Sequence, residues 1–440
     1  KRATISNLPP GYAINNATQV GDQWVMDLSD LDPNHLQLEL RYVLPEEGMR
    51  PDHNGFLGNF VLNILFSAED LQGGVHLYAG TQTFVFRDVQ TEDDVVFESE
   101  DGETRFYALN AVPPGTVISA GGGDDLVYAG AGHDTIDGGA GQNTISYAQS
   151  SAGVTVDLAA GTGQGGYAEG DILTNFSNIE GSAFADNLVG TSGDNVFIGS
   201  DGADRIIGNG GVDSVDYSGS TEGVTVNLQT GTGAGGQAEG DTLTGIANVT
   251  GSLTGDTVLT GTSGANVLIT GAGDDIISGG GGADTIVTGA GTDTVTYTGA
   301  ELSIDGGAGD DTLIMQIAAN VTLDAADQTS GDATLLAGFE NINAATVLGA
   351  MVVTANAGDN RITTGSGNDT INGFGGADII VAGAGNDTVS YNGAELSLDG
   401  GTGTNTLNLR TAVNVDLSLG DQTTGDLVTV VNFQNITATV

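Results

Sequence analysis

Residues 261–314 read, in blocks of nine, GTSGANVLI, TGAGDDIIS, GGGGADTIV, TGAGTDTVT, YTGAELSID and GGAGDDTLI. The eighth residue of every block is aliphatic, and the fourth is Gly in five of the six. One apolar residue in nine cannot form the apolar face of an α-helix, which needs a period of about 3.6. The pattern instead predicts a strand of about three residues followed by a six-residue turn. Two blocks would then form one coil of a flattened parallel β-helix, with the eighth residue pointing inward.

The same six-block cassette recurs 94 residues later, at 355–408, and shorter runs lie near Ala120 and at 190–216. A second duplication has a period of 70, since the segment that begins at Tyr147 matches the segment that begins at Tyr217. The stretches 156–181, 226–251, 315–354 and 409–440 break the nine-residue frame. We expect larger coils there, within a chain of stacked cassettes rather than one compact globule.

Such thin coils bury little apolar surface, so chain entropy would prevent folding unless something else stabilises the turns. Residues 111–440 hold 39 acids and 3 bases, Lys1 is the only lysine, and Cys is absent. Carboxylates and turn carbonyls offer only oxygen, which is the donor set that calcium prefers. The composition therefore predicts multiple Ca²⁺ ions in the turns, and folding that is coupled to ion binding.

The sixth residue of each regular block is the candidate carboxylate ligand. Asp275 and Asp293 are 18 residues apart, which is one full coil, and stacked strands lie about 4.8 Å apart. Two turns one coil apart could therefore coordinate one ion, with an acid from each turn and several carbonyls as ligands. The candidate ligands are Asp125, Asp134, Asn143, Asn195, Asp204, Asp213, Asn266, Asp275, Asp284, Asp293, Asp311, Asn360, Asp369, Asp378, Asp387 and Asn405.

Gly279-Gly-Gly-Gly-Ala-Asp284-Thr-Ile-Val and Gly306-Gly-Ala-Gly-Asp-Asp311-Thr-Leu-Ile resemble the calcium-binding repeat GGxGxDxUx of RTX (repeats-in-toxin) proteins. The resemblance covers most of 120–408. It implies a parallel β-roll with Ca²⁺ in the turns, which folds after type I export from a Gram-negative bacterium. It also implies that carbonyls of positions one to four complete the ion's shell, such as those of Gly121, Gly123, Gly130, Gly132, Gly271, Gly273, Gly280, Gly282, Gly289, Gly291, Gly307, Gly309, Gly365, Gly367, Gly383 and Gly385.

The chain departs from this pattern in three ways. Asn replaces Asp at 143, 195, 266, 360 and 405, which predicts weaker ion binding there. Four blocks begin with Tyr and lack an acid at position six; the Tyr either covers a turn without an ion or lies in a surface turn. These are Tyr147, Tyr217, Tyr297 and Tyr391. Acids within the irregular stretches are interpreted as solvated turn residues, with ion ligation as the alternative: Glu169, Asp171, Glu239, Asp241, Asp327 and Asp421.

The first 114 residues contain all seven prolines and only nine of the 73 glycines. Short runs rich in Val, Phe, Tyr and Leu, such as Trp24–Leu28 and Phe60–Phe66, predict a β-sandwich. The run Ile5–Tyr12 resembles the Ig-like modules of large RTX surface adhesins. The predicted fold class is all-β: an Ig-like β-sandwich at 1–112, then parallel β-roll (β-helix) solenoid with Ca²⁺ in the turns. Its predicted domains are 115–260, with the 70-residue duplicates, and the cassettes 261–354 and 355–440.

The net charge of −48 would repel nucleic acid and anionic membranes, and no apolar run reaches the length of a membrane span. No GxSxG elbow, P-loop or thiol nucleophile is present, so we expect no enzyme. The predicted function is an extracellular or cell-surface structural or adhesive segment of a longer RTX protein. Its expected partners are calcium ions, with self-association or a cell-surface or biofilm ligand left open. The alternatives are a calcium-bridged surface-layer or filament subunit, and the export module of a larger enzyme or toxin.

Overall fold

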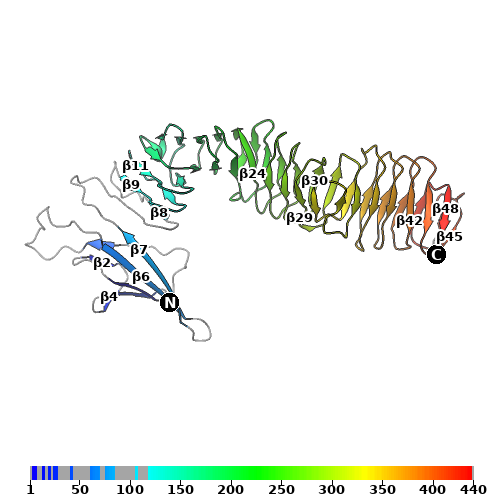
Figure 1. Ribbon diagram of the computed structural model, residues 1–440, viewed down its shortest axis with the longest axis horizontal. Coiled ribbons are helices and arrows are strands. Elements are labelled where there is room, and N and C mark those ends of the chain that lie inside the picture. The colour runs from blue at the N-terminus through cyan, green and yellow to red at the C-terminus, as the bar shows by residue number, and fades with distance from the viewer. Residues whose placement is uncertain are drawn as a thin grey trace, which may run out of the picture. The chain divides into compact units, whose positions relative to one another are not determined.

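Figure 1 shows the chain as a computed structural model. The structure describes residues 120–438 and, before them, only the backbone of nine strands, β1 to β9. The chain forms two compact units, residues 1–182 and 183–440. The regular elements of the described part are strands and two 3-10 helices of three residues each. The all-β prediction is therefore confirmed for these residues, while the predicted domain boundaries stay predictions.

Seven strands of the first unit pair only in antiparallel fashion. One sheet has the order β3-β4-β1-β6-β7, and β2 pairs with β5. These strands are β1 (Arg2–Ser6), β2 (Tyr12–Ile14), β3 (Thr18–Val20), β4 (Gln23–Asp27), β5 (Leu40–Tyr42), β6 (Phe60–Glu69) and β7 (Val75–Phe84). The predicted sandwich core, including Trp24, lies outside the residues whose side chains are described, so the Ig-like sandwich stays a prediction.

Seven further strands of the first unit pair in parallel, in two rows. The first row is β8 (Arg105–Tyr107), β10 (Leu126–Tyr128), β12 (Thr144–Ser146) and β16 (Asn178–Glu180). The second is β9 (Val117–Ser119), β11 (Thr135–Asp137) and β15 (Ile172–Thr174). Between β12 and β15 the chain inserts an antiparallel hairpin, β13 (Thr155–Asp157) and β14 (Thr162–Gln164), and the 3-10 helix η1 (Gly166–Ala168).

The second unit is a solenoid whose strands also stack in parallel rows, as the arrows from green to red show in Figure 1. One row is β18 (Val196–Ile198), β20 (Asp213–Asp216), β24 (Ile246–Thr250), β26 (Val267–Ile269), β28 (Thr285–Val287), β31 (Ser303–Asp305) and β36 (Leu335–Ala337). Farther along, a second row is β34 (Asn320–Thr322), β38 (Val352–Thr354), β40 (Thr370–Asn372), β42 (Thr388–Tyr391), β44 (Thr406–Leu409) and β48 (Asn435–Ala438).

The opposite wall runs along the whole second unit. It contains β17 (Asn187–Val189), β19 (Arg205–Ile207), β21 (Thr225–Asn227), β23 (Thr242–Thr244), β25 (Val258–Thr260), β27 (Ile276–Ser278), β30 (Thr294–Tyr297), β33 (Thr312–Met315), β37 (Asn341–Asn343), β39 (Arg361–Thr363), β41 (Ile379–Val381), β43 (Ser397–Asp399) and β47 (Thr429–Val431). Short elements in the turns are β22 (Thr232–Ala234), η2 (Gly236–Ala238), β29 (Ala290–Gly291), β32 (Ala308–Gly309), β35 (Thr329–Ser330), β45 (Asn414–Val415) and β46 (Thr423–Thr424).

The position-eight side chains form the core between the walls. Leu268, Ile286 and Ile304 lie in register on successive coils, and each is at most 1 % exposed. Their strand neighbours on either side are half-buried or exposed. The predicted inward direction of position eight is therefore confirmed, and it produces a seam about one side chain wide.

The stretches that break the nine-residue frame are enlarged coils, as expected. The structure adds that short antiparallel hairpins enlarge them. β21 pairs with β22, β34 with β35, and β45 with β46 before the chain returns to the parallel rows. No helix among the described residues is long and apolar enough to cross a membrane.

Candidate metal centre

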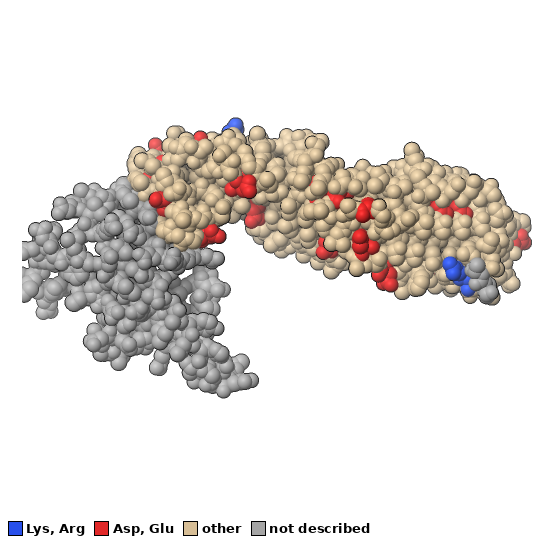
Figure 2. All heavy atoms as spheres, viewed as in Figure 1, with Lys and Arg blue, Asp and Glu red and all other residues tan. Residues whose placement is uncertain are grey.

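Every predicted position-six ligand is buried. All sixteen side chains are at most 4 % exposed. Fifteen of the residues lie directly before a strand, as Asp275 does before β27, and Asp213 is the first residue of β20. On the face seen in Figure 2, acidic side chains accordingly appear only in scattered groups. A buried carboxylate needs a positive or hydrogen-bonding partner, and the only bases in 111–440 are Arg205, Arg361 and Arg410.

Within residues 183–438, one oxygen of each position-six carboxylate accepts a backbone hydrogen bond from the coil one turn earlier in the chain. The backbone N–H of Asp275 donates to Asp293 Oδ1 at 2.8 Å, and that of Asp293 donates to Asp311 Oδ1 at 2.8 Å. The same bond joins Asn360 to Asp378 and Asp369 to Asp387. The spacing of 18 thus brings consecutive position-six residues together in columns along the edges of the solenoid.

The second oxygen has no such partner in much of the second unit. Within residues 183–438, nine buried position-six Oδ2 atoms make no hydrogen bond: those of Asp204, Asp213, Asp275, Asp284, Asp293, Asp311, Asp369, Asp378 and Asp387. Burial raises the pKa of Asp204 to about 8, of Asp311 to about 7, and of Asp275 to about 6. An ionised carboxylate in this position lacks a positive charge that would offset its desolvation.

Position-one glycine makes room for this second oxygen. A Cβ at Gly279 would lie 2.1 Å from Asp284 Oδ2, and one at Gly208 would lie 2.0 Å from Asp213 Oδ2. In this block the glycines at positions two and four, Gly280 and Gly282, have a left-handed backbone, with φ values of 89° and 120°. Gly279 does not have a left-handed backbone. Glycine is therefore needed at this position because a side chain would clash with the Asp284 carboxylate, and not because of the turn conformation.

The predicted carbonyl donors lie in closely stacked turns. The Gly271 and Gly383 carbonyls accept backbone hydrogen bonds from the next coil, at 2.8 and 2.7 Å. A Cβ at Gly291 would lie 1.9 Å from the Gly273 carbonyl oxygen, which shows how closely adjacent turns approach. No three acidic or histidine side chains of the described residues form a cluster, so an ion here would draw on one or two carboxylates and on backbone oxygens. The buried oxygens and the oxygen-only donor set fit calcium.

Sequence reasoning missed several members of the columns. Asp134 and Asp204 donate their backbone N–H groups to Asp171 Oδ1 and Asp241 Oδ1, at 2.9 and 2.7 Å, across 37 residues. The interpretation of Asp171 and Asp241 as solvated turn acids is wrong, because they are 1 % and 2 % exposed. The inserted hairpin lengthens the spacing between column members from 18 to 37 residues. The signal that could have identified Asp171 and Asp241 is an acid two residues before a buried Leu, as at Asp171 and Leu173.

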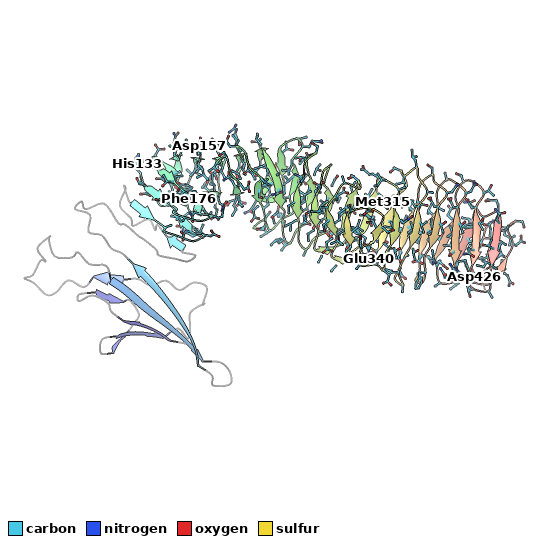
Figure 3. All side chains as sticks on the ribbon, in the orientation of Figure 1. His133, Asp157, Phe176, Met315, Glu340 and Asp426 are labelled. Carbon is cyan, nitrogen blue, oxygen red and sulfur yellow. The ribbon has the colours of Figure 1, made fainter. Side chains whose placement is uncertain are left out.

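Two further column members follow the same rule. The Asp311 N–H donates to Glu340 Oε2 at 2.9 Å, and Asp186, which is 4 % exposed, donates its N–H to Asp204 Oδ1 at 2.8 Å. Glu340, labelled in Figure 3, precedes the buried Ile342 by two residues. His133, also labelled there, is exposed.

The four block-leading tyrosines are buried, so the surface-turn interpretation is wrong. Each is at most 2 % exposed. The Tyr147 hydroxyl donates to Asp171 Oδ2 at 2.8 Å, and the Tyr217 hydroxyl donates to Asp241 Oδ2 at 2.7 Å. A hydroxyl thus satisfies the second carboxylate oxygen of Asp171 and Asp241, whereas the second oxygen of the nine position-six Asp residues within 183–438 makes no hydrogen bond.

The Tyr297 and Tyr391 blocks contain turns closed by their own carboxylate. Glu301, which is 3 % exposed, accepts hydrogen bonds from the backbone N–H groups of Thr298, Gly299 and Ala300 and from the Thr298 hydroxyl, at 2.6–3.1 Å. Glu395 accepts the equivalent backbone bonds. Amides rather than carbonyls therefore point into these turns, an arrangement that binds an anion and repels a cation.

Comparison with protein families agrees with this geometry. Residues 116–145, 180–215, 260–295, 303–314 and 354–389 match the model of the RTX calcium-binding nonapeptide repeat (4 copies). The chain thus carries RTX repeats, as the sequence resemblance indicated, and Ca²⁺ is the ion that such repeats bind in their turns. No curated protein matches the chain.

Proposed function

We propose that this chain is a non-catalytic structural or adhesive segment of a secreted RTX surface protein, and that it folds outside the cell as calcium binds. The observation that carries the proposal is the set of nine buried position-six Oδ2 atoms without a hydrogen bond in residues 183–438. An unsatisfied buried polar group costs about 1–3 kcal/mol, and a charged one more. Nine together rival the whole stability of a typical domain, about 5–15 kcal/mol.

Calcium would remove this cost. Inside a cell, where free calcium is scarce, the acidic chain would remain unfolded through self-repulsion and stay competent for type I export. At extracellular calcium, of millimolar order, the ions neutralise the turns, and binding free energy becomes folding free energy. The position-six residues and the turn carbonyls are the proposed ligands. The product is a stack of coils that could space or present a neighbouring module.

A calcium titration of the full chain tests this proposal, followed by far-UV circular dichroism and light scattering. We expect a coil-to-β transition on calcium addition without an increase in mass. Growth of particles along with the transition would support a calcium-bridged layer or filament subunit instead. A chain already β-structured in calcium-free buffer at neutral pH, and unchanged by calcium, would refute ion-driven folding.

A further inference from the structure

The two sequence duplications place Asn in one copy where the other copy has Asp. Asn143 precedes its counterpart Asp213 by 70 residues, and Asn405 follows its counterpart Asp311 by 94. All four side chains are 0 % exposed. Each pair therefore compares an Asn and an Asp at equivalent buried positions in the two copies of a duplicated coil.

In the first pair, the Asn side chain satisfies the turn by itself. Asn143 Oδ1 accepts the Asp125 N–H at 2.9 Å, as a position-six carboxylate does. Its Nδ2 donates to the carbonyl oxygen of Asn175 at 3.0 Å. Asn175 belongs to the enlarged coil that follows and has a left-handed backbone, with φ of 58°.

The Asp of that pair keeps the first bond and lacks the second. Asp213 Oδ1 accepts the Asn195 N–H at 2.8 Å. Gly245 is the counterpart of Asn175 and is also left-handed, with φ of 73°. A Cβ at Gly208 would lie 2.0 Å from Asp213 Oδ2 and 2.8 Å from the Gly245 carbonyl oxygen. Asp213 Oδ2 and the Gly245 carbonyl oxygen thus both lie beside Gly208. Asp213 Oδ2 makes no hydrogen bond within the described part of the chain.

Asn405 repeats the arrangement of Asn143. Its Oδ1 accepts the Asp387 N–H at 3.0 Å. Its Nδ2 donates to the carbonyl oxygens of Gly400 at 2.6 Å and of Asn432 at 3.2 Å. Asn432 is left-handed, with φ of 67°.

Asp311 repeats the arrangement of Asp213. Its Oδ1 accepts the Asp293 N–H at 2.8 Å, while its Oδ2 makes no hydrogen bond among residues 120–438. Gly338, the counterpart of Asn432, is left-handed with φ of 77°. A Cβ at Gly306, the counterpart of Gly400, would lie 2.3 Å from the Gly338 carbonyl oxygen.

The chemistry of the two side chains explains the difference. A carboxamide has two N–H donors and an ionised carboxylate has none, so only the carboxamide can bridge to a carbonyl without taking up a proton or a cation. We infer that Asn143 and Asn405 each take the place of one calcium ion, so that their turns close without metal, whereas the turns of Asp213 and Asp311 close around calcium. This inference rests on the proposed calcium-dependent function, and it replaces the expectation that these two Asn residues are weak ligands.

The test counts bound calcium in the full chain, by equilibrium dialysis and elemental analysis at saturating calcium. Asn143→Asp and Asn405→Asp should each add one ion per chain, and the double variant two. Asp213→Asn and Asp311→Asn should each remove one. Asn386→Asp and Asp274→Asn are matched controls at exposed position five, and they should leave the count unchanged.

A second readout does not depend on the ion count. The calcium concentration at the midpoint of the coil-to-β transition, followed by far-UV circular dichroism, should be lower for Asp311→Asn and higher for Asn405→Asp than for the wild type. Unchanged ion counts for both Asn405→Asp and Asp311→Asn, in a chain whose wild type binds calcium, would overturn the inference. Equal changes in the position-five controls would also overturn it, because net charge alone would then explain the counts. A wild type that binds no calcium would instead refute the proposed function.

Discussion

Replacing Gly279 with Ala tests directly whether the position-six carboxylate lies against position one. The new Cβ would lie 2.1 Å from Asp284 Oδ2, 2.7 Å from its Cγ and 3.0 Å from its Cβ. Rotating the carboxylate cannot relieve these contacts, because the stem of the Asp284 side chain is also too close. Either the turn shifts, or the side chain leaves and gives up the hydrogen bond from the Asn266 N–H, which is 2.9 Å long.

The structure sets the size of this effect. Overpacking a tight site costs about 1–3 kcal/mol, and losing a hydrogen bond to a charged group costs about 1.5–3 kcal/mol. A total near 3 kcal/mol would lower the melting temperature by about 6–12 °C in a unit of this size. Gly281→Ala is the control in the same block, since its Cβ would meet no atom within 4 Å and its φ is not left-handed. We expect it to be neutral, or more stable by about 0.4–1 kcal/mol.

Thermal unfolding of the full chain in saturating calcium, followed by circular dichroism, measures both variants. Calcium titrations should also show weaker binding for Gly279→Ala than for Gly281→Ala. Equal melting temperatures and equal calcium affinities for the two variants would show that no carboxylate lies against position one, and would refute the geometry described for the site.

Three further predictions follow from the buried acids. In calcium-free buffer, the folded-state pKa values of Asp204 (about 8) and Asp311 (about 7) exceed the unfolded value of about 3.9. The folded state therefore holds protons that the unfolded state has lost, so without calcium the β-structure should be most stable near pH 4 and should be lost as pH rises toward about 8; a calcium-free circular dichroism spectrum that stays the same over this pH range would contradict this. Tyr217→Phe removes the donor to Asp241 Oδ2 and should cost about 1–3 kcal/mol, measured by thermal unfolding against the wild type. Glu301→Gln turns a donor toward backbone amides and should cost about 2 kcal/mol, equally in urea titrations at a low and at a saturating calcium concentration that both keep the chain folded; a cost that grows with calcium concentration would make Glu301 an ion ligand.

Much of the repeat architecture could be predicted because its causes are local. An aliphatic residue at position eight must point inward in a three-residue strand, and Ile286 and its counterparts do so. The stacking of Asp275 on Asp293 follows from coils of 18 residues. Asp171 and Asp241 were missed because an inserted hairpin changes their spacing, and only the folded coil brings them back to the column.

The sequence by itself determined the period, the direction of the apolar seam, the spacing of position six by 18 residues and the oxygen-only chemistry that suits calcium. These depend on residues within one or two blocks. Only the tertiary structure decided what meets the second oxygen or nitrogen of each buried side chain. Tyr147 reaches Asp171 Oδ2, Asn143 reaches the Asn175 carbonyl, and Asp213 Oδ2 meets no donor in the described residues. The physical reason is that the partner of this second atom comes from a neighbouring coil. The path of that coil depends on the hairpin inserted between the two residues.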